Sequence, residues 1–408
     1  MKSRTIAIAG GGAAGFFAAI AAANANPRAQ VVLFEKSPEL LSKVTLSGGG
    51  RCNVTHHCFD VPRLLLNYPR GARELNGPYR RFQPRDTVEW FESRGVPLKV
   101  ESDGRMFPVT DSSSSIVNCL RKEAEEAGVR VFTRRGLCAF QPGAQGFALR
   151  LTDGTAFEAE RLLLATGGNK ATAGYSLAAS VGHTIEAPVP SLFTFTIEDS
   201  TLRDLAGISM PDAQITAPAQ RLAQKGPLLI THWGLSGPAA LKLSAWGARE
   251  FAGCEYTFDI LVSWQRGPRD VFAAQLADCR KRHPRRVVVG GGVLEAPARL
   301  WEWLCRRAEI PADRQWAQLS KAGENRLLEE IYACRLSVNG KSLYKDEFVT
   351  CGGVRLSEVD FRTMESKRCP GLHFAGELLD VDAVTGGFNF QAAWTSGWIA
   401  GRAMAGAE

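Results

Sequence analysis

The chain has 408 residues, 45% of them hydrophobic and 22% charged, which argues against long disordered stretches and suggests two or three domains. Basic residues number 49 against 42 acidic ones, and this net charge of +7 suits a polyanionic cofactor or an acidic small molecule but is too diffuse to indicate nucleic acid. The 10 cysteines form no Cys-x-x-Cys pair, so we expect no metal site and a reduced, cytoplasmic protein.

The N-terminus has two interpretations. Lys2 and Arg4 precede an apolar stretch, and Ala23-Asn24-Ala25 is typical of a signal-peptide cleavage site. A nucleotide-binding unit explains more of the same residues, including the glycines and Glu35, so we reject secretion. No other segment is apolar for long enough to span a bilayer, and we expect no membrane association.

A strand–turn–helix–strand unit is predicted at the start of the chain. Two short apolar runs rich in β-branched residues predict buried parallel strands, with an alanine-rich helix between them. The parts are a strand at Thr5–Ala9, the G-x-G-x-x-G turn at Gly10–Gly15, a helix at Phe16–Ala25, a strand at Gln30–Phe34 and the acid Glu35. This order is typical of a Rossmann-type dinucleotide-binding unit.

Each part of the unit has a physical role. Gly10 permits the tight turn, Gly12 leaves room for a pyrophosphate, and Gly15 lets the helix pack close to the sheet. The helix N-terminus offers free N–H groups and a positive dipole end to phosphates. Glu35 lies about 20 residues further on, where an acid accepts hydrogen bonds from ribose hydroxyls and disfavours a 2′-phosphate. The nucleotide is therefore FAD or NAD, and not NADP.

Three later segments favour FAD. Lys43–Asn53 contains three successive glycines and predicts a loop with exposed backbone, with a plain flexible loop as the alternative. Leu162–Gly168 predicts a buried strand ending in small residues, which an ordinary strand and turn would also explain. Gly371–Asp380 predicts a strand followed by an acid, and a helix is predicted just after Gly386-Gly387. The dipole of that helix would stabilise negative charge on a reduced flavin, although a plain core helix is the alternative.

The middle of the chain has a different pattern. Strands are predicted at Leu192–Ile197, Gln214–Thr216 and Glu255–Val262, and helices at Arg269–His283 and Ala298–Ala308. These elements favour a small β-rich region that carries a helical one.

Two motifs in this region bear on chemistry. Val287–Val293 resembles a second dinucleotide turn, but Glu295 occupies the place of the third glycine, so no clear NAD(P)H domain is expected. Histidine is a common proton donor in catalysis, so His232 is a candidate for that role. Alternatively, Thr231 or Ser236 caps a helix while His232 satisfies local backbone groups.

Specific motifs extend over nearly the whole chain. They are Gly10–Gly15, Ser47–Thr55, Gly104–Pro108, Ala165–Gly168, Thr231–Pro238, Val349–Val354, Met364–Lys367, Ala375–Glu377 and Gly386–Asn389. Together they resemble the HI0933-like flavoprotein family, the YhiN-type NAD(P)/FAD-dependent oxidoreductases. The chain departs from the family at His56, Cys351 and Phe388, where asparagine, alanine and tyrosine are more usual, which puts in doubt a role for a phenol hydroxyl at position 388.

The resemblance implies an α/β fold, with a Rossmann-type, glutathione-reductase-like FAD domain interrupted by a β-rich and helical insertion. We expect a discontinuous FAD domain at 1–190 and 351–408, an inserted domain at 191–350, and a helical subdomain within it at roughly 268–335. The residues expected to bind FAD are Gly10, Gly12, Ala13, Ala14, Gly15, Glu35, Lys36, Lys43, Ser47, Gly49, Gly50, Arg51, Cys52, Asn53, Ala165, Thr166, Gly167, Gly376, Glu377, Asp380, Gly386, Gly387, Phe388 and Asn389.

Two residues of the glycine loop keep alternative roles. The resemblance places Arg51, Cys52 and Asn53 near the isoalloxazine, and Arg51 is a candidate catalytic residue. It is equally a structural cation that pairs with Glu377 or Asp380. Cys52 is a redox thiol or a small packing residue, and packing is favoured because no second cysteine is suitably spaced.

The predicted function is that of an FAD-dependent oxidoreductase that reduces a conjugated or unsaturated small molecule, with NAD(P)H as a transient reductant. One alternative is an FAD-dependent dehydrogenase or oxidase that runs in the oxidative direction. Another is a non-catalytic flavin-binding partner protein, supported only by the basic stretches Arg63–Arg85 and Arg280–Arg286. We expect no nucleic-acid partner, and the oligomeric state is left open.

Overall fold

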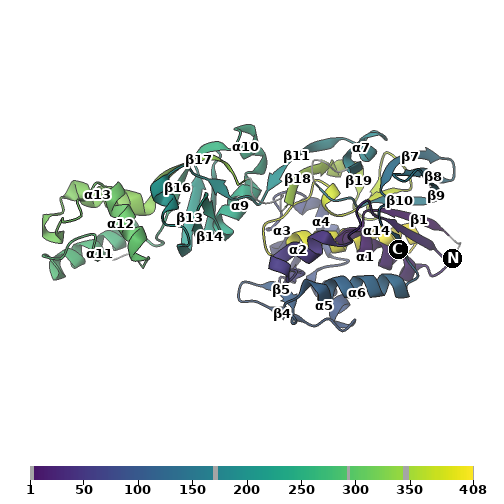
Figure 1. Cartoon of the computed structure of the whole chain (residues 1–408), viewed down its shortest axis with the longest axis horizontal. Coiled ribbons are helices and arrows are strands. Elements are labelled where there is room, and N and C mark those ends of the chain that lie inside the picture. Colours follow the sequence, from purple (N-terminus) through teal and green to yellow (C-terminus); the bar gives the residue numbers. More distant parts are fainter. Residues whose placement is uncertain (1–3, 169–172, 292–294, 343–348, 408) are drawn as a thin grey trace. The chain divides into compact units, whose positions relative to one another are not determined.

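The structure is a computed structural model that describes residues 4–168, 173–291, 295–342 and 349–407. The chain forms two compact units, one made of Met1–Val189 with Val349–Glu408 and the other of Pro190–Phe348 (Figure 1). The first unit contains both ends of the chain, so residues from the head and the tail meet in it.

A mixed sheet with the strand order β19-β20-β21-β10-β1-β2-β6 forms the centre of the first unit. The five strands from β21 to β6 are parallel, and β19 and β20 extend the sheet with antiparallel pairing. The strands are β1 (Thr5–Ala9), β2 (Gln30–Phe34), β6 (Arg130–Phe132), β10 (Arg161–Leu164), β19 (Val359–Asp360), β20 (Glu365–Ser366) and β21 (Leu372–Phe374). The apolar runs of β1, β2 and β10 are buried, as expected of central parallel strands.

Helices α1 (Ala13–Ala25) and α14 (Phe388–Ala405) run beside each other against this sheet (Figure 1). Their backbones approach closely, since a Cβ added at Gly397 would lie 2.5 Å from the carbonyl oxygen of Ala14. The predictions of β1, β2 and of a helix after Gly387 are confirmed. Helix α1 begins three residues earlier than predicted, because Gly12 is its N-cap.

Shorter elements complete the first unit. Two antiparallel sheets contain β3 (Thr55–His56), β5 (Arg105–Pro108) and β4 (Leu98–Val100), and β7 (Leu137–Gly143), β8 (Gly146–Leu151) and β9 (Ala156–Ala159). Strands β11 (Ile185–Ser191) and β18 (Val349–Val354) pair where the chain leaves and re-enters the unit. The helices are α2 (Ser42–Gly50), α3 (Val61–Leu65), α4 (Ala72–Tyr79), α5 (Pro84–Glu92), α6 (Ser113–Glu126), α7 (Ala173–Ala179), η2 (Leu356–Glu358) and η3 (Gly376–Leu378).

The second unit contains a closed barrel with the strand order β12-β15-β14-β13-β16-β17. The strands are β12 (Phe195–Thr196), β13 (Ser209–Ala217), β14 (Leu222–Thr231), β15 (Gly234–Ser236), β16 (Thr257–Ser263) and β17 (Cys334–Lys341), with helices α8 (Ser200–Arg203), α9 (Pro238–Trp246) and α10 (Ala248–Gly253). The strand predicted at Leu192–Ile197 is shorter than expected, because Leu192 has a φ of 60° and breaks the extended backbone.

A helical part belongs to the same unit. It consists of α11 (Arg269–Arg282), α12 (Ala298–Arg307), η1 (Trp316–Gln318) and α13 (Lys321–Tyr332). Buried tryptophans such as Trp264 and Trp303 join these helices and the barrel in one apolar core. Val287, in the segment that resembles a dinucleotide turn, forms an isolated bridge with Gln315. The last two residues of that segment, Gly292 and Val293, lie outside the described residues.

Candidate functional site

The turn between β1 and α1 can be built only from glycine at two positions. Gly10 has a φ of 117°, and a Cβ there would lie 2.2 Å from the carbonyl oxygen of Ala165. A Cβ at Gly15 would lie 1.9 Å from the carbonyl oxygen of Gly10. At Gly12, by contrast, an added Cβ would meet no atom within 4 Å. The turn therefore packs tightly against the sheet and leaves open space at the start of α1.

The first turn of α1 is suited to an anion. Gly12 is the N-cap, no side chain caps the helix, and no acidic residue lies in its first turn. The N–H groups of this turn, Ala13 and Ala14 included, and the positive end of the helix dipole therefore face the open space beside Gly12. This arrangement fits a pyrophosphate group.

Glu35 directly follows β2, lies beside the glycine turn and is half-buried. Its Oε2 accepts a hydrogen bond from the Gly11 N–H (2.7 Å), and its Oε1 accepts one from the Ser37 N–H (2.8 Å). A carboxylate has about four acceptor positions, so both oxygens can still accept from ribose hydroxyls. Lys36 follows and is exposed.

Segments from later in the chain reach the same turn. The Ala165 N–H donates to the Ala9 carbonyl (2.8 Å), which places Ala165 and Thr166 beside Gly10. Gly167 has a φ of 79° and turns the chain away from β10. A Cβ at Gly376 would lie 2.9 Å from the Cβ of Ala14, so the tail of the chain packs on the first turn of α1.

The segment predicted as a loop at Lys43–Asn53 is partly helical. Helix α2 covers Ser42–Gly50, so the loop prediction is wrong for its first residues. The helix breaks at Ser47, Gly48 and Gly49, whose dihedral angles are not helical. The φ values at the three glycines from Gly48 are 59°, 70° and 85°, which favour glycine. Exposed glycine backbone is therefore present, and it follows a helical turn.

Arg51 ties this glycine segment to the hairpin of β4 and β5. Its Nη1 lies 2.7 Å from Glu101 Oε1 and 3.5 Å from Asp111 Oδ1, and its guanidinium carbon lies 4.0 Å from the centre of the Phe107 ring. A Cβ at Gly48 would lie 3.0 Å from the same ring. The hydrogen bond to Glu101 raises the pKa of Arg51 above its ordinary value.

The predicted pairing of Arg51 with Glu377 or Asp380 is wrong, because other groups occupy both acids. Lys43 forms an ion pair with Glu377, and Asp380 accepts a hydrogen bond from the Gly352 N–H (3.0 Å). The Lys43–Glu377 pair links α2 to η3, which lie 334 positions apart in the chain.

Cys52 is fully buried with a φ of 62°. Burial raises the pKa of its thiol to about 12. A neutral, enclosed thiol is a poor nucleophile, which supports the packing alternative for Cys52 over a redox role. Asn53 follows it. With its side-chain amide oriented so that the nitrogen donates and the oxygen accepts, the oxygen accepts a hydrogen bond from the Gly387 N–H at 2.9 Å.

Gly386 and Gly387 lead into α14 with φ values of 135° and 89°. Gly387 is the N-cap, and no side chain caps the helix. Asn389 bonds back to Ala383 through both ends of its amide (2.9 and 3.0 Å). The Phe388 ring stacks on His56, with ring centres 4.6 Å apart.

Buried polar groups that were not predicted from the sequence hold this helix start. The Tyr68 hydroxyl donates to the Phe388 carbonyl (2.6 Å), and the Tyr79 hydroxyl donates to Tyr68. Gln391 is fully buried; its Oε1 accepts from the hydroxyls of Thr55 (2.6 Å) and Thr87 (2.9 Å), and its Nε2 donates to Thr395. The bonds of Tyr68 to Phe388, and of Thr55 and Thr87 to Gln391, join residues 304 to 336 positions apart, so no local pattern could reveal them.

His232 belongs to the second unit and is exposed on the turn between β14 and β15. The Thr231 hydroxyl accepts from the N–H groups of Trp233 and Gly234, at 3.3 and 3.2 Å, so it closes this turn. The prediction that Thr231 or Ser236 caps a helix is wrong, because the N-cap of α9 is Gly237.

The described residues contain no group of three or more His, Cys, Asp or Glu side chains that could hold a metal ion. In the same part of the chain, no helix is both long and apolar enough to cross a bilayer. The uncapped starts of α1 and α14 and the carboxylate of Glu35 form an arrangement that is suited to a dinucleotide.

Residues 4–403 match the model of the HI0933-like protein Rossmann domain. The chain is 32% identical over 417 residues to a 3-dehydro-bile acid delta(4,6)-reductase of Clostridium scindens, with 98% of each chain covered. It is 31% identical over 411 residues to a ribosomal RNA dihydrouridine synthase of Escherichia coli, again with 98% of each covered. The name of the second relative leaves the expectation of no nucleic-acid partner open.

A solved structure of a 3-ketosteroid-delta4-(5alpha)-dehydrogenase of Rhodococcus jostii RHA1 has a similar fold. Its TM-score is 0.53 at 14% identity, and the match covers 99% of this chain and 97% of that one. At this identity the likeness concerns the fold alone. The predicted α/β fold, a Rossmann-type domain with a β-rich insertion, is confirmed.

Proposed function

Because the chain belongs to the HI0933-like protein family, whose members are FAD-dependent oxidoreductases, we propose that it reduces a carbon–carbon double bond conjugated with a carbonyl group. NADPH or NADH is the proposed electron donor, docking transiently. The observation that carries the proposal is the start of α1, where glycine-only backbone and an uncapped helix end leave room for the FAD pyrophosphate.

The names of the two relatives describe the same kind of reaction. A delta(4,6)-reductase of a 3-dehydro compound saturates double bonds conjugated with a ketone. Dihydrouridine differs from uridine by two hydrogens across a double bond that is conjugated with a ring carbonyl. In both cases a hydride adds to a carbon of the double bond and a proton adds to its neighbour. When bound, FAD supplies the hydride from its reduced ring.

The protein groups have distinct proposed roles. The turn at Gly10–Gly15 and the first residues of α1 would bind the pyrophosphate of FAD, and Glu35 would accept hydrogen bonds from the ribose hydroxyls. The dipole of α14 would stabilise negative charge on the reduced ring. We assign Arg51 to holding the glycine segment rather than to catalysis, since two carboxylates and an aromatic ring already engage it. His232 is the proposed proton donor.

Two substrate classes follow from this chemistry. The first is a small conjugated ketone. The second is uridine in RNA, which is supported by the dihydrouridine synthase relative and by the arginine-rich helices between Arg63 and Arg85. A dehydrogenase or oxidase that works in the opposite direction is the competing enzymatic function.

Anaerobic addition of NADPH, and separately of NADH, to the purified flavoprotein tests the proposal. The flavin absorbance should bleach within one turnover time and return when a conjugated ketone or a uridine-containing RNA is added. The product should carry two additional hydrogens by mass spectrometry. Flavin that is reduced only by a saturated substrate, with oxygen consumed on re-oxidation, would support the oxidative function instead.

Replacing His232 with Gln tests its role as proton donor. The variant should slow reoxidation of the reduced flavin by substrate and leave flavin bleaching by the donor unchanged.

A further inference from the structure

Helix α4 has two chemically different faces. Its inner face contributes Leu75 and Tyr79, which are buried, and Tyr79 bonds through Tyr68 to the carbonyl at the start of α14. Arg73 and Arg80 are exposed and lie seven residues apart, which places them two helical turns apart on the same side. The outer face is therefore cationic, and it lies on the side of α4 opposite the buried tyrosine.

The neighbouring segments continue this cationic surface. Between positions 63 and 85 the chain has six arginines and one acidic residue, Glu74. Arg70 is bound to the buried Asp382. The other five, Arg63, Arg73, Arg80, Arg81 and Arg85, are exposed and form no ion pair with any carboxylate in the described ranges of the chain. Their charges are available to an external anion.

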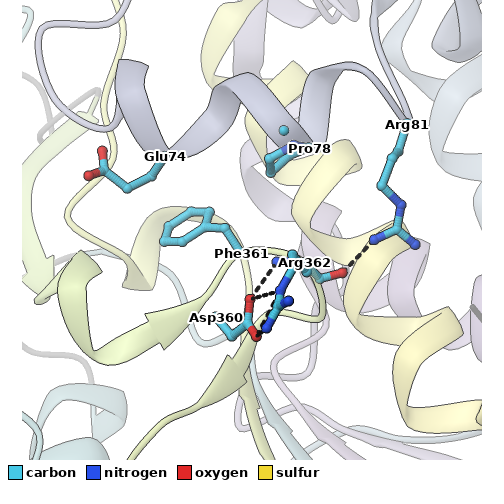
Figure 2. Close-up of a pocket in the computed structure, with 7 residues that line it drawn as sticks. Glu74, Pro78, Arg81, Asp360, Phe361 and Arg362 are labelled. Carbon is cyan, nitrogen blue, oxygen red and sulfur yellow. Dashed lines mark hydrogen bonds and ion pairs between the residues drawn. The ribbon is translucent and has the colours of Figure 1, made fainter.

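The surface is hollowed beside Arg81 (Figure 2). A cavity of about 300 Å³ lies between α4 and the turn from β19 to β20, and is lined by Glu74, Gly77, Pro78, Arg81, Asp360, Phe361 and Arg362. Arg81 donates a hydrogen bond to the Arg362 carbonyl, and Asp360 holds the Arg362 guanidinium at 2.7 Å. The rim is thus held by these bonds and carries two basic and two acidic side chains, so the cations available to an anion are the exposed arginines on α4 and beside it. The rings of Pro78 and Phe361 supply an apolar wall.

We propose that this surface binds RNA, with the exposed arginines on α4 and beside it contacting phosphates and one base resting against Phe361 in the hollow. The inference rests on the proposed function in its RNA form. Guanidinium groups match phosphate oxygens in geometry as well as charge. Aromatic side chains that alternate with cations are the usual platform for unpaired bases. An anionic membrane would use the arginines but would leave the hollow and its aromatic wall without a role.

Binding of a fluorescein-labelled oligouridylate to the full-length, flavin-loaded protein tests the surface by fluorescence anisotropy over a salt series. Replacing Arg73 and Arg80 together with Gln removes two cations. It should weaken binding roughly 20-fold near 0.1 M salt and reduce the slope of log K against log salt by about 1.4. The control replaces Lys281 and Arg285, two exposed cations of the second unit, with Gln and should leave binding unchanged.

The aromatic wall gives an independent readout. Phe361→Ala should weaken binding roughly tenfold at every salt concentration, because loss of stacking does not release counterions, and Phe361→Tyr should restore it. Equal losses in both double variants, or no RNA binding by the wild type, would overturn the inference. So would arginine-dependent binding to phosphatidylserine vesicles without binding to RNA. Flavin content is measured first in each preparation, since wild-type protein that holds no flavin contradicts the proposed function and not this surface.

Discussion

The two helices that meet in the first unit begin alike but are held differently. Helix α1 starts at Gly12 and α14 at Gly387, and neither has a side-chain cap. Around the start of α1 the close neighbours are backbone atoms, such as the carbonyl of Gly10 against Gly15. Around the start of α14 the supports are buried side chains, with Tyr68 bound to the first residue and Gln391 bound one turn later.

This difference separates two ways of holding an uncapped helix start in place. Where backbone atoms pack this closely, the chain cannot shift to make room, so the residue must be a glycine, which has no Cβ. Buried hydrogen bonds depend on every partner being satisfied, and loss of one leaves another unpaired. Substitutions at α1 should therefore act sterically, and those at α14 through unsatisfied polar groups.

The largest effect is expected at Gly15. Gly15→Ala puts a methyl group 1.9 Å from a backbone oxygen that cannot move aside, and should lower the free energy of unfolding of the flavin-free protein by about 3 kcal/mol. Urea denaturation followed by circular dichroism measures it. Gly12→Ala is the matched control, because its methyl group enters open space. It should leave flavin-free stability within about 0.5 kcal/mol of wild type while weakening FAD binding. Equal stability losses in the two variants would contradict a steric origin.

A smaller loss is expected at Gln391. Gln391→Leu keeps the volume but leaves the buried hydroxyls of Thr55 and Thr87 without their acceptor, and should cost about 2 kcal/mol of unfolding free energy. Thr87→Val removes only one donor and should cost about half as much. If the Leu variant unfolds at the same urea concentration as wild type, the hydrogen-bond account of α14 fails.

A still smaller loss of stability is expected at Tyr68 and Tyr79. Tyr68→Phe removes the donor to the Phe388 carbonyl and the acceptor of Tyr79, and should cost about 1.5 kcal/mol in unfolding free energy. Tyr79→Phe leaves the bond from Tyr68 to Phe388 intact and should cost less. A larger loss in the Tyr79 variant would show that packing, and not support of α14, dominates at this pair.

A pH-dependent effect is expected at a buried network outside both helix starts. Glu358 contacts His183 at 3.1 Å, and Arg368 and Thr184 also bind it. Burial would raise the pKa of Glu358, but the hydrogen bonds from Arg368 and Thr184 outweigh it and lower the pKa to about 2. Burial lowers the pKa of His183 below its ordinary 6.5.

The lowered pKa values of Glu358 and His183 both make the folded protein less stable as the pH falls. The unfolded chain binds protons more readily than the native protein, so stability should fall as the pH drops below about 6.5 and again from about 4.5 towards 2. Glu358→Gln should be less stable than wild type above pH 4.5, with the gap closing towards pH 2. Thermal unfolding over this range measures the gap; a gap that stays constant with pH would rule out titration of Glu358.

Local patterns in the sequence were sufficient to predict the structure around the start of α1. The strands at Thr5–Ala9 and Gln30–Phe34 have the predicted bounds, and the glycines between them occupy the tight positions expected of them. The predicted start of α14 is confirmed for the same reason, since Gly386-Gly387 marks it without reference to distant residues.

Long-range pairing could not be predicted in this way. The sequence shows that Arg51 is a cation beside a glycine turn, but the choice of Glu101 over Glu377 depends on how β4 and β5 fold back. The barrel likewise joins β12 to β15 and β17, and no residue pattern in the short β12 specifies these neighbours. Prediction succeeded where backbone geometry demands a residue type, and failed where a common side chain has several possible partners.

Titration of the flavin-free protein with FAD tests directly whether the start of α1 binds the dinucleotide. We expect quenching of flavin fluorescence that saturates at one FAD per chain, with Gly12→Ala binding FAD more weakly at unchanged fold stability. A folded wild-type protein that takes up no FAD, or that binds FMN equally well and so makes no use of the adenosine and second phosphate, would contradict it.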